Sequence, residues 1–262
     1  MKITLIGSGN VATHLARALS LIESIKLEIC SRNAASGISL AQALKVKFVQ
    51  DLKSIDFTSD FVILAVKDDA IPEVLNSLIH DSGYLKANHR SVFLHTSGAI
   101  PLTVFEGKVN NFGVFYPLQT FSKNKDLIFS EVPLFIEANS SSNLSLIQDL
   151  AAKLVSKTWV LDSEQRKILH LAAVFACNFT NHLYALSQAL LENADLSFDM
   201  IKPLIMETAD KIKLQNPLDV QTGPAKRNDV ITMHMHQDML ANNEDMLAIY
   251  QILSDSIKNT NK

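Results

Sequence analysis

A glycine-rich turn near the start of the sequence has the residue types and the spacing that most clearly predict chemistry. Gly7, Gly9 and Ala12 form a GxGxxA pattern between a short apolar run and an amphipathic helical stretch. In this pattern the first glycine permits a tight turn, the second lets the backbone approach a pyrophosphate, and the small third residue lets helix and strand pack closely. A turn that is merely rich in glycine is the alternative, but its place between a strand and a helix favours a ligand. We therefore expect a dinucleotide to bind at six consecutive residues, Gly7, Ser8, Gly9, Asn10, Val11 and Ala12.

The end of the second expected strand indicates which dinucleotide binds. A site for NAD usually presents Asp or Glu there, about 20 residues after the glycine turn, to bind the ribose 2′-hydroxyl. This chain has Ser31, Arg32 and Asn33 instead. Arg32 offers a planar, permanently charged donor suited to a 2′-phosphate, and Ser31 adds a hydroxyl donor. We expect NADP(H) as the cofactor; a solvated surface arginine is the alternative.

Alternating strands and helices must position these residues. Apolar runs predict strands, and helical spacing predicts helices between them. The run at 61–66 is apolar at every position, which is typical of a parallel strand covered on both faces. The expected strands are 3–6, 27–30, 47–49, 61–66, 91–94, 111–115, 133–136 and 158–161, and the expected helices are 10–22, 34–44, 69–78 and 142–154. This alternation predicts an α/β fold with a doubly wound parallel Rossmann sheet.

Several further candidates follow the strands at the edge where open α/β folds bind their ligands. Ala65 and Val66 end one apolar run, and Thr96 and Ser97 follow the next, so we expect all four in the cofactor site. His95 emerges at the same edge. It is a candidate general acid, and a histidine that stabilises the turn is the alternative.

The character of the sequence changes at Asp162. Asp162 and Gln165 resemble a capping box, and long helical patterns follow with no clear strand. The expected helices are 163–193, 198–214 and 232–259. We therefore expect two domains, a Rossmann domain at 1–162 and an all-helical domain at 163–262.

Motifs in both halves resemble known families. GSGNVA, SRN, FVILAVKDDAI and FLHTSG, in this order, resemble the 6-phosphogluconate-dehydrogenase-like superfamily, especially pyrroline-5-carboxylate reductases and deazaflavin-dependent NADP reductases. HTSGAIPL, YPLQTFS, HLAAVFACNFTNHL and TGPAKRND are more similar to a bacterial family described as NADP oxidoreductases, with a Rossmann-like domain and a C-terminal domain of unknown function. The resemblance implies a C-terminal domain that forms a homodimer and whose long helix lines a cleft over the nicotinamide.

The sequence departs from the better-known relatives on this long helix. Pyrroline-5-carboxylate reductases carry a GSGPAY-like segment where this chain has residues 176–181, so their substrate is in doubt here. β-Hydroxyacid dehydrogenases of the superfamily use a lysine four residues before an asparagine. Neither Val174 nor Cys177 is lysine, so their mechanism does not carry over.

Polar residues on the long helix are the remaining catalytic candidates. Asn178 and Asn181 are close neighbours, whereas His170 shares their side of the helix but lies roughly 12 Å along the axis from Asn178. We expect catalytic roles for Asn178 and His170 and a substrate contact for Asn181. A buried asparagine satisfied by backbone and a histidine that merely braces two domains are the alternatives.

Two loop residues are candidates for substrate binding. Gln119 follows a further strand end, where the family resemblance places a loop beside the pocket, although a rigid turn would also explain this segment. Arg227 precedes an expected helix that Asp229 could cap, and it could bind an anionic substrate or pair with Asp229.

Composition excludes several classes of protein. The apolar fraction of 47% and the net charge of -3 are those of an ordinary globular protein, and neither half is basic enough for nucleic-acid binding. No apolar stretch approaches the roughly 18 residues of a membrane span. His234 and His236 do not share a helix face, so we expect no metal site. Cys30 and Cys177 form no metal or redox motif, which favours a cytoplasmic protein.

Together these features predict an enzyme that transfers a hydride between NADPH and a small substrate with a C=N or C=O bond. The alternative is a protein that binds NADP(H) as a sensor without turnover, because the usual lysine of the superfamily is missing.

Overall fold

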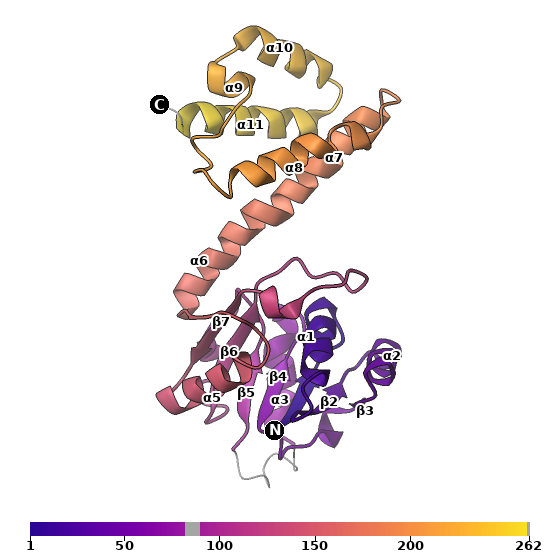
Figure 1. Ribbon diagram of the computed structural model, residues 1–262, viewed down its shortest axis with the longest axis vertical. Coiled ribbons are helices and arrows are strands. Elements are labelled where there is room, and N and C mark those ends of the chain that lie inside the picture. The colour runs from indigo at the N-terminus through magenta and orange to yellow at the C-terminus, as the bar shows by residue number, and fades with distance from the viewer. Residues whose placement is uncertain (82–89, 261–262) are drawn as a thin grey trace. The chain divides into compact units, whose positions relative to one another are not determined.

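The computed structural model in Figure 1 describes residues 1–81 and 90–260 of the chain. The chain forms two compact units, Met1–Cys177 and Asn178–Lys262. The strands end at Val160, and the capping box that was expected at Asp162 and Gln165 is present at the start of the next helix. The predicted domain boundary after Asp162 stays a prediction.

An eight-stranded sheet forms the centre of the first unit, with the order β3-β2-β1-β4-β5-β6-β7-β8. The strands are β1 Lys2–Ile6, β2 Lys26–Cys30, β3 Lys47–Val49, β4 Phe61–Leu64, β5 Val92–His95, β6 Phe112–Pro117, β7 Leu134–Ala138 and β8 Thr158–Val160. Consecutive β-α units on both sides of β1 confirm the predicted α/β Rossmann fold.

One pairing departs from the parallel arrangement that the sequence predicted. β7 runs antiparallel to β6, while the other neighbours in the sheet are parallel. The connection from β6 to β7 holds only a short 3-10 helix, η4 Phe129–Glu131. A parallel return usually passes through an α-helix that covers one face of the sheet, and this connection, residues 118–133, contains no α-helix.

Helices cover both faces of the sheet (Figure 1). On β4, Phe61 and Ile63 belong to one core and Val62 and Leu64 to the other, because successive side chains of a strand point to opposite faces. The helices are α1 Asn10–Ser20, α2 Ala34–Leu44, α3 Ile71–Ile79 and α5 Ser141–Ala151, and the other 3-10 helices are η1 Leu52–Ser54, η2 Asp68–Ala70 and η3 Leu102–Phe105. α1 and α5 pack in the first core and α3 in the second.

The rest of the chain is helical, as predicted. The expected helix at 163–193 is formed by α6 Ser163–Ala173, a π-helical segment at Val174–Phe179, and α7 Thr180–Glu192. The following helices are η6 Phe198–Met200, α8 Lys202–Lys211, α9 Pro224–Arg227, α10 Val230–Met239 and α11 Glu244–Thr260. No helix among the described residues is long and apolar enough to cross a membrane.

The prediction of one helix at 232–259 is wrong. α10 ends at Met239 and α11 begins at Glu244. Asn243 separates them, because its backbone N–H donates to the Leu240 carbonyl at 2.8 Å and its side chain accepts from the backbone N–H of Met246 at 3.0 Å. Asparagine favours such local side-chain bonds, which compete with a continuous helix.

Candidate functional site

A cavity of about 710 Å³ lies in the first unit at the carboxyl ends of β1, β2 and β4. Its wall contains most of the residues that the sequence assigned to the cofactor: Gly7, Ser8, Gly9, Asn10, Val11, Ser31, Arg32, Asn33, Ala65, Val66 and Thr96. Three acidic residues that the sequence analysis did not select, Asp68, Asp69 and Glu73, also line it. Ala12 and Ser97 do not.

The two glycines of the turn are glycine for different reasons. Gly7 has a φ of +130°, and a Cβ there would overlap the Ala65 carbonyl of the neighbouring strand end. Gly9 has an ordinary φ of -75°, and a Cβ there would meet nothing within 4 Å. Ala12 is buried, and a Cβ on Gly7 would lie 3.5 Å from its Cβ, so Ala12 packs beneath the turn. The fold requires glycine at 7, whereas glycine at 9 leaves open space beside the backbone.

A chain of short polar side chains joins the glycine turn to the end of β2. The hydroxyls of Ser8 and Ser31 lie 2.8 Å apart, and Ser31 also donates to the Asn33 carbonyl at 3.2 Å. The Asn33 side chain accepts from the backbone N–H of Ser36 at 3.0 Å and caps α2. No carboxylate takes part in this chain of contacts, so it fits a phosphate better than a ribose diol.

Arg32 lines the cavity and forms an ion pair with Glu73, another lining residue, at 3.4 Å. Both side chains are largely exposed, at 66% and 70%. Exposed ion pairs contribute little net free energy, about 0–1 kcal/mol. The guanidinium can therefore exchange Glu73 for a phosphate at small cost.

His95 is the last residue of β5 and is fully buried. Its Nδ1 accepts from the backbone N–H of Ser97 at 3.2 Å, and its ring stacks on Phe105. Burial, with the Arg166 guanidinium adding to it and the Pro101 carbonyl opposing it, lowers the pKa of His95 to about 3. The Pro101 carbonyl accepts from the backbone N–H of Val104 at 3.2 Å, and His95 Nε2 has no hydrogen-bond partner among the described residues.

The turn after β5 continues with Thr96, which lines the cavity, and Ser97, which does not. The Ser97 hydroxyl accepts from the backbone N–H groups of Ala99 and Ile100 at 3.1 and 3.0 Å. These bonds give Ser97 a role in shaping the turn, and its predicted cofactor contact stays a prediction.

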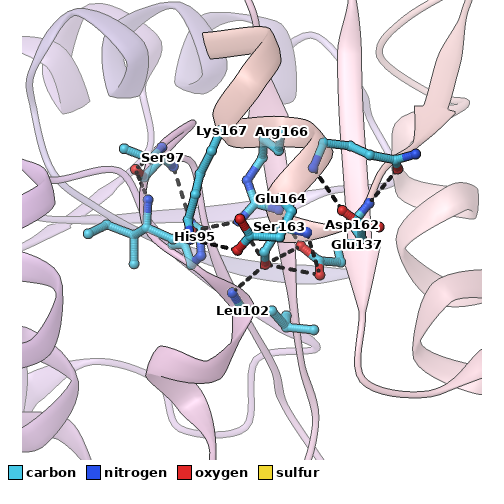
Figure 2. Close-up of polar contacts among 12 residues, drawn as sticks. His95, Ser97, Leu102, Glu137, Asp162, Ser163, Glu164, Arg166 and Lys167 are labelled. Atoms are coloured by element: carbon cyan, nitrogen blue, oxygen red, sulfur yellow. Dashed lines mark hydrogen bonds and ion pairs between the residues drawn. The ribbon is translucent and has the colours of Figure 1, made fainter. Parts of the chain in front are cut away.

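Arg166 on α6 forms the buried centre of a cluster that the sequence did not reveal (Figure 2). Its side chain is 1% exposed, pairs with Glu137 of β7, and donates to the Ile100 carbonyl at 2.6 Å. The Ser163 hydroxyl donates to Glu137 at 2.9 Å and accepts from the backbone N–H of Leu102 at 2.9 Å. The cluster fastens the start of α6 to β7 and to the loop after His95.

Tyr116 at the end of β6 and His170 on α6 form a second polar pair beside that loop. The Tyr116 hydroxyl lies 3.0 Å from His170 Nδ1. A Cβ on Gly98 would lie 2.7 Å from both His170 Nδ1 and Tyr116 Cζ, so glycine is needed for the loop to approach the pair. Burial raises the pKa of Tyr116 to about 12; the Arg166 guanidinium opposes this rise, and the charge of Asp68 in the cavity wall adds to it. The hydroxyl is therefore protonated at neutral pH.

Gln119 does not line the large cavity. Its side-chain oxygen accepts from the backbone N–H of its neighbour Thr120 at 2.8 Å, and it borders a separate cavity of about 60 Å³. This local hydrogen bond holds the Gln119 side chain against its own loop. The predicted contact of Gln119 with substrate stays a prediction.

The other predicted substrate and catalytic residues belong to the second unit. Asn178 lies in the π-helical segment, Asn181 lies on α7 and Arg227 lies on α9. All three are exposed. Asp229 caps α10 by accepting from the backbone N–H of Thr232 at 3.1 Å, as expected. In the part of the chain that the structure describes, no cluster of three His, Cys, Asp or Glu side chains could hold a metal ion.

Comparisons with known proteins agree with this geometry. Residues 2–87 match a family described as "NADP oxidoreductase coenzyme F420-dependent", and residues 132–257 match a domain of unknown function (DUF2520). A Bacteroides fragilis protein described as a "putative NADP oxidoreductase" is 42% identical, with 98% of each chain covered and a TM-score of 0.91. The chain belongs to this NADP oxidoreductase family. The resemblance predicted from the sequence, and NADP(H) as the cofactor of the family, are confirmed.

Two more distant solved structures share the fold of this chain. A pyrroline-5-carboxylate reductase from Coxiella burnetii is 15% identical, with 97% of each chain covered and a TM-score of 0.61. A reductive aminase from Aspergillus terreus in complex with NADPH and ethyl-5-oxohexanoate is 13% identical, with 98% of this chain and 94% of that chain covered and a TM-score of 0.71. No curated protein matches the chain.

Proposed function

We propose that this chain is an oxidoreductase that transfers a hydride between NADP(H) and a small substrate with a C=N or C=O bond. The single observation that carries the proposal is the cavity wall, where open space at Gly9 is combined with a β2 end that offers Arg32 and no carboxylate. Solved structures with the same fold as this chain include a pyrroline-5-carboxylate reductase and a reductive aminase, which supports a substrate with a C=N or C=O bond.

Each part of the cavity wall has a role in this proposal. Backbone N–H groups at the start of α1 bind the pyrophosphate, because a helix N-terminus attracts anions. Ser31, Arg32 and Asn33 bind the 2′-phosphate, and the strand ends at Ala65, Val66, Thr96 and Ser97 lie toward the nicotinamide. The bound dinucleotide supplies or accepts the hydride, and the protein supplies orientation and a proton.

The proton donor that we propose is the Tyr116 hydroxyl, with His170 Nδ1 at 3.0 Å to return a proton to it. A buried hydroxyl whose pKa is raised holds its proton until a more basic substrate atom lies within hydrogen-bond distance. His95 is the second candidate, since its Nε2 has no partner among the described residues. Asn178 stays a predicted catalytic residue, and Asn181, Gln119 and Arg227 stay predicted contacts of the substrate.

A screen of imines, 2-oxo acids and aldehydes that follows NADPH absorbance tests the function. For any substrate that is turned over, Tyr116→Phe should lower kcat by about 100-fold, because one proton donor is removed, while NADPH affinity stays within about twofold. Tyr250→Phe is the matched control, since Tyr250 makes a similar contact with His236 Nδ1 at 3.0 Å in the second unit. Equal losses in both variants would contradict the role of Tyr116.

A non-catalytic NADP(H) sensor is the second candidate function. Val174 and Cys177 in the π-helical segment provide no amine where related dehydrogenases have a lysine. Tight NADPH binding without turnover of any compound in the screen would favour the sensor.

We also propose that the protein is a homodimer that forms through its helical unit and resides in the cytoplasm. In the described part of residues 178–262, the buried side chains are only Ala225, Met233, Leu240 and Ser254. Large apolar side chains stay exposed there, including Met200, Leu204, Met206, Ile231 and Met239. Such a large apolar surface indicates a protein interface, and a second copy of this unit is the partner that could cover it symmetrically.

Both cysteines are free thiols, which fits a reducing compartment such as the cytoplasm.

A further inference from the structure

The loop between β6 and β7 passes over the start of α1, as Figure 1 shows. The Asn10 side chain donates to the Phe121 carbonyl at 2.9 Å, and His14 Nε2 lies 2.8 Å from the Ser122 carbonyl. The rings of His14 and Phe121 pack with centroids 5.3 Å apart. These contacts fix the loop beside the glycine turn and so fix the position of the next residue, Lys123.

Lys123 reaches from this loop to the beginning of α2. Its ammonium donates to the Ser36 hydroxyl at 3.0 Å, and the same hydroxyl donates to the Ser8 carbonyl at 3.1 Å. Ser36 lies in the first turn of α2, three residues after Asn33. The ammonium is therefore separated from the cavity wall at Ser8 by a single hydroxyl group.

No carboxylate among the described residues forms an ion pair with Lys123; its ammonium donates to the neutral hydroxyl of Ser36. The side chain is partly buried. A cation beside the first turn of a helix is disfavoured by the helix dipole. An anion bound between the glycine turn and α2 would reverse this, since it would be attracted by both the lysine and the helix.

We propose that Lys123 is a second cation for the 2′-phosphate of NADP(H) and, with Arg32, determines the preference over NAD(H). The proposal rests on the cofactor site proposed above. The two cations differ in their present partners: Arg32 is paired with Glu73, whereas Lys123 is held by a neutral hydroxyl. Lys123 can therefore turn from Ser36 to the phosphate without breaking an ion pair.

Calorimetry with two nucleotides tests the role directly. Adenosine 2′,5′-bisphosphate and adenosine 5′-monophosphate differ only in the 2′-phosphate. Their binding can be measured without knowing the substrate of the enzyme. Lys123→Met should weaken binding of the bisphosphate by about tenfold, as expected for one lost charge-assisted hydrogen bond, and change binding of the monophosphate by less than about twofold. Lys123→Arg should keep most of the affinity. Lys125→Met, an exposed lysine of the same loop, is the matched control and should change neither.

The outcomes separate this inference from the proposed function. Equal weakening of both nucleotides by Lys123→Met, or no weakening of either, would overturn the role of Lys123. If Arg32→Ala still lost bisphosphate affinity selectively in that case, the proposed cofactor site would stand. If the unaltered protein bound neither NADPH nor the bisphosphate, the proposed function would fall, and this inference with it.

Discussion

At the scale of single residues, the two glycines of the opening turn separate the needs of the fold from those of a ligand. The backbone at position 7 has a positive φ that disfavours any side chain, and a Cβ there would overlap the Ala65 carbonyl, whereas a Cβ at position 9 would point into open space. We expect Gly7→Ala to lower the free energy of unfolding by at least about 1–3 kcal/mol, the usual cost of such backbone strain.

Gly9→Ala should leave stability within about 0.5 kcal/mol but weaken NADPH binding at least tenfold, because the methyl group occupies the approach to the pyrophosphate. Urea denaturation and calorimetry on both variants check this pair of predictions. A stable Gly9→Ala protein with unchanged NADPH affinity would mean that no ligand approaches the backbone there.

The buried His95 makes a prediction about pH. Its pKa is about 3 in the folded protein and near 6.5 when unfolded, so at intermediate pH the unfolded state binds the extra proton. Stability from this residue is complete above about pH 6.5 and falls as the pH decreases toward 3, by about 1.4 kcal/mol per pH unit.

His95→Asn, which keeps an acceptor for the Ser97 N–H, should show a correspondingly flatter dependence of unfolding free energy on pH between 6 and 4. His80→Asn, at the exposed end of α3, serves as the control. Identical slopes for His95→Asn and the unaltered protein would show that His95 already carries its charge in the folded state.

At the scale of elements, the ion pair of Arg166 and Glu137 attaches α6 to the sheet. Removing one partner leaves a buried charge unpaired, so Arg166→Met should lower the free energy of unfolding by about 3–5 kcal/mol. One residue further along α6, Lys167 forms an exposed pair with Glu164, and Lys167→Met should cost no more than about 1 kcal/mol. Denaturant titration measures the unfolding free energy of both variants. Similar losses in the two would show that the buried ion pair contributes no more to stability than the exposed one.

The connections between elements explain where the predicted order of helices and strands fails. A connection without an α-helix returns β7 antiparallel to β6. Local hydrogen bonds of Asn243 divide the final helical stretch into α10 and α11. The absence of a crossover α-helix decides the first case and local hydrogen bonds decide the second, and a hydrophobic pattern records neither.

At the scale of the whole molecule, the exposed apolar side chains of the helical unit lead us to expect self-association. Replacing both Met200 and Leu204 by lysine should raise the dissociation constant of the dimer about 30-fold or more, since large apolar residues dominate such interfaces. Leu21, an even more exposed apolar residue, lies in the first unit, and Leu21→Lys should have no effect. Light scattering across a range of protein concentrations measures the change. A monomer at every concentration in the unaltered protein would contradict the dimer.

Patterns in the amino-acid sequence were enough to predict the Rossmann fold, the glycine turn, the Arg32 end of β2 and the helical character of the second half. These features depend on periodicity and on residues a few positions apart, which a linear pattern records. The Arg32 end of β2 also predicted NADP(H) as the cofactor, and the comparisons confirm this cofactor for the family.

Only the tertiary structure paired Tyr116 with His170, Glu137 with Arg166 and Lys123 with Ser36, residues that are 54, 29 and 87 positions apart. It also placed His95 in the core and Gln119 outside the large cavity. Each of these results depends on which strand ends and loops meet in space. Such contacts follow from the packing of the whole sheet, so a single sequence, read by periodicity and spacing, does not reveal them.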